Sequence, residues 1–150
     1  MNTTKHFLPK AEFDAIYAKV PRVTVEVIVR TDKGIVLSKR SIEPCIGQWH
    51  IPGGTVRFAE PLHDAVKRIA QDELGVTVAI DKLLGYIEYP QMLADGYKGW
   101  PVGITFETHI VAGELRGSDQ GEEIGQFTQV PPHTISDQAA FLNMHVFGEW

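Results

Sequence analysis

Residues 53 to 76 read GGTVRFAEPLHDAVKRIAQDELGV, a glycine turn followed by a helical pattern and a glycine stop. Pro61 suits a first helical position, because its missing N–H costs nothing there, and Gly75 is a typical helix terminator. The pattern therefore predicts a helix over about 61–74. Its apolar residues form one stripe at 100° per residue, which indicates packing on a sheet: Leu62, Ala65, Val66, Ile69 and Ala70.

Charged residues on this helix point to chemistry. Glu73 falls inside the apolar stripe, and a carboxylate aimed at a core needs a cation or an arginine beside it. Arg68 and Asp72 lie one turn apart on the shoulder of the stripe, so a salt bridge between them explains Asp72 as well as metal binding does. Glu60 at the helix start interacts favourably with the helix dipole and is in reach of Arg68, which favours a structural role for Glu60.

Length and composition limit the possible classes of protein. A chain of 150 residues with 43% hydrophobic residues predicts one compact domain over 1–150. No apolar run approaches the ~18 residues that span a bilayer, and the start MNTTKHFLPK lacks the apolar centre of a signal peptide, so we expect a cytoplasmic protein. The single cysteine, Cys45, excludes an internal disulfide and a cysteine metal cluster. A net charge of −5 argues against nucleic acid polymers and anionic membranes as partners.

The remaining chain reads as strands around this helix, with a further helix at each end. Alternating or β-rich runs predict strands over 22–30, 35–40, 48–51, 76–80, 83–89, 102–111 and 127–130. Helices are predicted over 9–19 and 136–144, the second with Ser136 as its cap. In the strand over 22–30, the valines at 23, 25, 27 and 29 face one way and residues 24, 26, 28 and 30 the other.

Two loops carry candidate ligand contacts. Pro52-Gly53-Gly54 predicts a tight turn whose backbone can approach a ligand, so the carbonyl of Gly53 is a candidate metal ligand. The long loop over 90–101 contains Tyr97 and Trp100, which can stack on a base or a sugar or pack against this domain or a second subunit. His50 and His63 have no partner at a zinc-like spacing and are expected to be surface or packing residues.

The spacing of Gly54, Glu60, Arg68 and Asp72-Glu73-x-Gly75-Val76 resembles the signature of the Nudix hydrolases. The resemblance implies an α+β fold, the Nudix α/β/α sandwich with a mixed β-sheet, and a role for Arg68 in the site. The family pattern places a metal-binding glutamate directly after the arginine, where this chain has Ile69. That departure implies fewer metals, altered chemistry or no catalysis. The GDP-mannose mannosyl hydrolases also lack this glutamate, and residues 21–76 resemble that branch.

The resemblance to the mannosyl hydrolases implies further site residues. In that branch a carboxylate on the first strand and two arginines support departure of the diphosphate. Glu26 stands at the carboxylate position, Arg40 matches the arginine that ends the second strand, and Thr55 replaces the arginine after the glycines. A metal-binding glutamine and a histidine base follow in the late loop, where this chain has Gln120 and Gly121.

The missing histidine leaves the general base open. A positioned base contributes typically ~10² to 10⁴-fold, so Glu122 or Glu123 is expected to take that role. Many Nudix pyrophosphohydrolases use a glutamate of this loop, and water then attacks phosphorus. Carboxylate and carbonyl oxygens suit Mg²⁺ or Mn²⁺. The candidate metal ligands are Gly53, Asp72, Glu73 and Gln120, with Glu73 the principal one.

The leading hypothesis is a Mg²⁺-dependent hydrolase of a nucleoside diphosphate linked to another moiety, a sugar above all. Arg40 would contact the phosphates, with Tyr97 and Trp100 at the base or sugar. One alternative is a GDP-mannose mannosyl hydrolase that attacks the sugar carbon with another base. Another is a catalytically silent nucleotide-binding domain. A homodimer is expected, because dimers are common in the resembling families.

Overall fold

The computed structural model describes residues 7–117 and 122–148, and its core is one mixed sheet. The strands within these ranges are β1 (Arg22–Thr31), β2 (Gly34–Lys39), β3 (Trp49–His50), β4 (Gly53–Thr55), β5 (Val76–Glu88), β6 (Pro101–Gly113) and β7 (Ile124–Phe127). The sheet has the order β3-β2-β1-β6-β5, while β4 pairs with β1 and β7 with β2. β1 and β6 are parallel, whereas β2 and β4 pair with β1 in the antiparallel direction.

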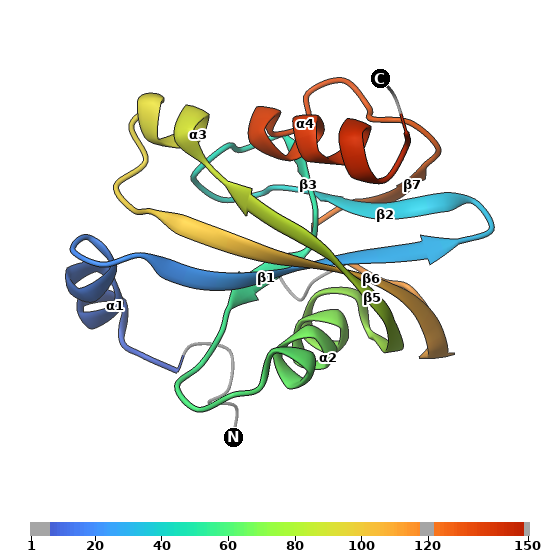
Figure 1. The fold of residues 1–150 in the computed structure, drawn as a ribbon, viewed down its shortest axis with the longest axis horizontal. Helices are drawn as coiled ribbons and strands as arrows, with labels where there is room; N and C mark the ends of the chain where they lie inside the picture. Colours follow the sequence, from blue (N-terminus) through green and yellow to red (C-terminus); the bar gives the residue numbers. More distant parts are fainter. Residues whose placement is uncertain (1–6, 118–121, 149–150) are drawn as a thin grey trace.

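Helices cover both faces of this sheet. They are α1 (Lys10–Tyr17), α2 (Leu62–Leu74), α3 (Pro90–Ala94) and α4 (Ser136–His145). Figure 1 shows α2 below the sheet, α3 and α4 above it, and α1 beside the start of β1. This arrangement confirms the predicted α+β fold with α/β/α layers. Within the described ranges, no helix is long and apolar enough to span a membrane.

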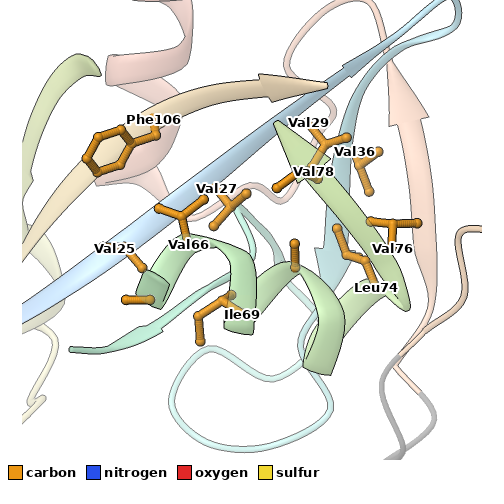
Figure 2. Close-up of a cluster of buried hydrophobic side chains, with 12 residues drawn as sticks. Val25, Val27, Val29, Val36, Val66, Ile69, Leu74, Val76, Val78 and Phe106 are labelled. Atoms are coloured by element: carbon orange, nitrogen blue, oxygen red, sulfur yellow. The ribbon is translucent and has the colours of Figure 1, made fainter. Parts of the chain in front are cut away.

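The alternation along β1 builds a separate core on each face. Val25, Val27 and Val29 pack with α2 residues, and Figure 2 shows this cluster between the helix and the sheet. Ile28 points the other way into a second cluster that includes Leu142 of α4. Since strand side chains alternate between faces, one strand contributes to both cores. The polar members of the second face, Thr24 and Glu26, are buried too, and they belong to the site described below.

The starts of the helices differ from the prediction by one residue. Pro61 is the N-cap of α2 with ψ 147°, so it precedes the first helical residue instead of occupying that position. Its extended backbone turns the chain into the helix. Gly75 ends α2 with φ 72°, the left-handed conformation that glycine adopts without penalty. The N-cap of α4 is Ile135, and Ser136 is its first helical residue, so the predicted serine cap is wrong.

Strand boundaries differ more. Asp81 and Lys82 do not separate two strands, because β5 continues through them with irregularities that absorb the extra residues. Gly53 and Gly54 do not form a free turn but pair with β1 as strand β4. The last strand is earlier than predicted, at Ile124–Phe127, and the loop over 90–101 begins with the short helix α3. These differences follow from pairing partners that are distant in sequence.

Candidate active site

A pocket of about 220 Å³ opens where the start of β1 meets the β3–β4 segment, the loop before β6 and α4. Four of the predicted site residues line it: Glu26, Arg40, Gly53 and Tyr97. Its lining also includes residues that sequence reasoning did not select for the site: Arg22, Thr24, His50, Tyr89 and Gln138. The predicted carboxylate, arginine and glycines therefore meet at one place.

Glu26 is the buried carboxylate of this pocket and is only 5% exposed. Its Oε2 accepts hydrogen bonds from the Tyr89 hydroxyl at 2.7 Å and from the Thr24 hydroxyl at 3.3 Å. Burial raises the pKa of Glu26 to about 7, although these hydrogen bonds and the charges of Arg22 and Arg40 act in the opposite direction. Glu26 therefore titrates near neutral pH.

Glycines on both neighbouring strands make room for Glu26. A Cβ atom on Gly53 would lie 2.5 Å from Glu26 Oε1, and one on Gly103 would lie 2.3 Å from Oε2. Real Cβ atoms do not approach an oxygen so closely, so both positions favour glycine for steric reasons. The side chain of Glu26 fits into the space that the absent Cβ atoms of Gly53 and Gly103 leave.

A chain of buried hydrogen bonds holds Glu26 from α4. The Ile51 N–H donates to Gln138 Oε1 at 2.7 Å, Gln138 Nε2 donates to the Tyr89 hydroxyl oxygen at 2.8 Å, and that hydroxyl donates to Glu26. Burial, followed by the Glu26 charge, raises the pKa of Tyr89 well above its usual value, so the phenol stays protonated and can donate. Sequence reasoning missed Tyr89 and Gln138, because their partners are distant in sequence. Tyr89 lies 63 residues from Glu26, and Gln138 lies 49 residues from Tyr89.

Two arginines of the pocket are held by neutral groups. Arg22 donates from Nη1 to the Thr55 hydroxyl and from Nη2 to the Tyr97 hydroxyl, each at 2.8 Å. Arg40 donates to the backbone carbonyls of Pro44 and Glu43. Neither guanidinium forms an ion pair with any carboxylate of residues 7–117 and 122–148. The pocket lining therefore holds two guanidinium groups and one carboxylate, Glu26.

Arg68 on α2 takes part in a different arrangement. Its guanidinium binds Glu60 through two hydrogen bonds of 2.8 and 2.9 Å and donates to the carbonyl of Thr55 at 3.0 Å. The Arg68 hydrogen bonds hold the pKa of Glu60 below its usual value. This clamp joins the start of α2 to β4, and among the described residues Arg68 forms its ion pair with Glu60 and none with Asp72. The role expected for Glu60 agrees with it, while a catalytic role for Arg68 stays a prediction.

The two candidate base residues have different surroundings. Glu122 is buried beside His50, with 3.8 Å between Oε1 and the imidazole Nε2, and His50 holds the pKa of Glu122 below its usual value. Glu123 has a side chain that is 65% exposed and lies 3.8 Å from Lys39. Glu122 thus contacts His50, which lines the pocket, while neither Glu122 nor Glu123 lines it. Gln120 and Gly121 lie outside the described residues.

Comparison with protein-family models decides the family. The model for the NUDIX domain matches residues 20–146, which is most of the chain. The chain belongs to the NUDIX domain family. Its signature helix is α2, and the two glycines of β4 before that helix line the pocket.

Similar proteins fit this family. The low-salt glycan biosynthesis protein Agl8 of Haloferax volcanii is 45% identical over 82 residues, 55% of this chain and 53% of Agl8. An ADP-ribose pyrophosphatase of Methanocaldococcus jannaschii is 32% identical over 103 residues, 69% of this chain and 59% of that protein. The chain thus spans just over half the length of these relatives. The crystal structure of a MutT NUDIX hydrolase from Burkholderia pseudomallei has a TM-score of 0.71 and 28% identity, covering 85% of this chain and 98% of that one.

NUDIX proteins generally use divalent metals, so the donor set of α2 is informative. Ile69, at the position of the family glutamate, is buried, and its Cδ1 atom would lie 2.5 Å from a Cβ on Gly54. Glu73 lies one turn further along the same helix face, and both Glu73 and Asp72 are half-buried. No group of three His, Cys, Asp or Glu side chains that could hold a metal occurs in residues 7–117 and 122–148. Carboxylate and carbonyl oxygens are the ligands that suit Mg²⁺, which keeps several waters and substrate oxygens as further ligands.

A second hollow lies on another part of the described surface. An open groove of about 700 Å³ lies between the end of β5 and α4, lined by Glu88, Asp137, Phe141 and His145 among others. Its lining contains two carboxylates and neither arginine nor lysine, so it is unsuited to a diphosphate. Trp100 is half-buried next to β1, where its carbonyl accepts the Arg22 N–H, and it is not part of the lining of the first pocket.

Proposed function

We propose that the protein hydrolyses nucleoside diphosphates linked to a sugar. The observation that carries this proposal is the pocket that joins Arg40 and the buried Glu26 to the glycines before α2. A guanidinium binds phosphate oxygens in a planar, two-pronged geometry. The names of the relatives support the substrate class, since one is a glycan biosynthesis protein and the other an ADP-ribose pyrophosphatase. ADP-ribose is itself a nucleoside diphosphate linked to a sugar.

Arg40 and Glu26 would act on the diphosphate. Arg40 would neutralise charge on the phosphates, which is the largest need in phosphoryl transfer. Glu26, with a pKa of about 7, would be protonated in part of the molecules at neutral pH. In that form it can donate a hydrogen bond to a phosphate oxygen of the leaving group. Tyr97 lines the same pocket and would contact the base or sugar, whereas Trp100 of the same loop does not line it.

Glu122 would be the general base. The lowered pKa keeps its carboxylate ionised near neutral pH, so it can accept a proton from the attacking water. His50 donates from Nδ1 to the carbonyl of Ile51 at 2.9 Å, which leaves Nε2 facing Glu122. In the form that carries a proton on both ring nitrogens, the imidazole would orient this carboxylate and stabilise its charge. Glu122 would then replace the histidine base of the mannosyl hydrolases, at whose position this chain has Gly121.

A divalent metal would bind beside α2. Glu73 and Asp72 would hold Mg²⁺ or Mn²⁺ together with the carbonyl of Gly53 and, from the late loop, Gln120. The ion would supply charge neutralisation for the diphosphate. Glu73→Gln is expected to lower turnover by about two orders of magnitude or more without unfolding the protein. Retained turnover in this variant would contradict the metal assignment.

Phosphorus NMR of the products tests the function itself. The protein is incubated with Mg²⁺ and a panel of nucleoside diphosphate sugars that includes GDP-mannose and ADP-ribose. A nucleoside monophosphate together with a sugar phosphate is the expected result, since water then attacks phosphorus. Release of a free nucleoside diphosphate would instead indicate attack at the sugar carbon, as in the mannosyl hydrolases. No product from any substrate would favour a silent nucleotide-binding domain, in which Ile69 has replaced a catalytic carboxylate.

A further inference from the structure

Arg22 begins β1, and its side chain faces the pocket. Arg22, Thr24 and Glu26 alternate along the strand and all three line the pocket, as residues two apart on one strand face do. The backbone of Arg22 is fixed by the hydrogen bond from its N–H to the carbonyl of Trp100 at 2.9 Å. The guanidinium therefore stands on a paired strand and not on a free loop.

The guanidinium of Arg22 is held from three sides. Thr55 of β4 and Tyr97 of the loop before β6 accept its two Nη hydrogen bonds. Behind it, the rings of Phe13 and Tyr17 on α1 have their centroids 5.4 and 6.0 Å from Cζ. Its Nε atom is buried and has no hydrogen-bond partner within residues 7–117 and 122–148. An arginine ordered in this way loses little further side-chain entropy when it binds a ligand.

The charged partners of the arginines indicate which kind of ligand Arg22 can bind. Arg30 and Arg68 are paired with carboxylates, Arg30 with Glu107 at 3.0 Å and Arg68 with Glu60. In the part of the chain that the structure describes, Arg22 donates only to neutral hydroxyls and Arg40 only to neutral carbonyls. The lining contains these two guanidinium groups and a single carboxylate, so it stays positive even when that carboxylate is ionised. A buried positive pocket favours an anionic ligand.

We infer that Arg22 is a second phosphate-binding arginine of this pocket and acts together with Arg40 on the diphosphate of the substrate. The inference rests on the proposed function for the identity of its ligand. Arginine has five N–H donors, and the hydroxyls of Thr55 and Tyr97 engage only two of them. The guanidinium of Arg22, on β1, also contacts Thr55, the β4 residue that directly follows the two glycines.

Inorganic pyrophosphate is the probe that tests this inference without turnover. Its affinity is measured by titration calorimetry, with and without Mg²⁺, for the wild type and for Arg22→Met, Arg22→Lys and the control Arg30→Met. Arg22→Met is expected to weaken binding by about tenfold to a hundredfold, the usual effect of losing hydrogen bonds to a charged group. Arg22→Lys should recover part of the loss, because it keeps the charge without the planar fork. Arg30→Met should bind as the wild type does.

A further variant separates phosphate binding from a structural role. Thr55→Val removes a hydrogen-bond partner of Arg22 while the guanidinium stays in the pocket. Its pyrophosphate affinity should stay near that of the wild type. An affinity loss in Thr55→Val as large as in Arg22→Met would overturn the inference, because the position would then serve the architecture of β4. Wild-type affinity in Arg22→Met, or a wild type that does not bind pyrophosphate, would overturn it too.

Hydrolysis assays distinguish the inference from the function on which it rests. If the wild type cleaves nucleoside diphosphate sugars and Arg22→Met has the same KM and the same pyrophosphate affinity, the function stands and the role of Arg22 fails. If pyrophosphate binding depends on Arg22 and no nucleotide sugar is cleaved, the anion site stands and the hydrolase function fails.

Discussion

The two sides of the site are built in different ways. On the α2 side, Glu60 and Arg68 lie eight residues apart in one continuous stretch and clamp the helix to β4. On the other side, Glu26, Tyr89 and Gln138 come from three elements and meet through buried hydrogen bonds. The first side is a local motif that stabilises the scaffold. The second is assembled by the fold, and it holds the groups that can bind and move protons.

The adjacent glutamates of the late loop are expected to show the largest contrast. Glu122→Gln should lower turnover by about 10² to 10⁴-fold, because the buried Glu122 would be the base, while the stability of the protein changes little. Glu123→Gln is the matched control and should keep wild-type turnover, since its side chain is exposed. Steady-state kinetics of both variants measure this. A larger loss in Glu123→Gln would reverse the assignment.

Substitution of the paired arginine on the α2 side is expected to lower the free energy of unfolding. Arg68→Met leaves Glu60 largely buried without its partner, so we expect the free energy of unfolding to fall by about 2 to 4 kcal/mol. Arg30→Met removes the more exposed pair with Glu107 and should cost about 0 to 1 kcal/mol. Urea unfolding of both variants gives the comparison. Equal losses would show that the clamp on β4 is no stronger than an ordinary surface ion pair.

The pocket side should respond to pH through Glu26. Its pKa is about 7 in the folded protein against a usual 4.5, so the folded state binds the extra proton between these values. The effect of Glu26 on the free energy of unfolding is therefore absent below pH 4.5. As the pH rises from 4.5 through 7, this free energy falls by about 3 kcal/mol. Glu26→Gln should remove this decline, so the variant gains stability over the wild type at pH 8 and not at pH 4. Parallel pH profiles of the two proteins would contradict the burial effect.

Local pattern predicted much of the scaffold. The apolar stripe of α2 and the glycine that ends it follow from periodicity and backbone chemistry, and Ile69 is buried as the stripe requires. The alternation along β1 placed Glu26 on the opposite face from Val25 and Val27, and the structure has each face in a different environment. These features depend on neighbours within a few residues, which a sequence displays directly.

The partners across the pocket could not be predicted in the same way. Gln138 is a polar residue on a helix, for which exposure is the ordinary expectation, yet it is 4% exposed because α4 covers the sheet at Tyr89. The sequence pattern predicted Arg22 only as the first residue of a strand, with no role in the site. Its contact with Thr55 arises from the pairing of β1 with β4, a register that no single segment encodes. Long-range pairing therefore decided which polar residues reached the site.

The most direct test of the account is steady-state hydrolysis of the nucleotide sugar that the wild type cleaves best, measured for Arg40→Met beside Arg30→Met. Both arginines lie near strand ends, and only Arg40 lines the pocket. The account predicts that Arg40→Met loses about tenfold to a hundredfold in kcat/KM while Arg30→Met is unchanged. Equal kcat/KM values for the two variants, with both proteins folded, would contradict the placement of the diphosphate in this pocket.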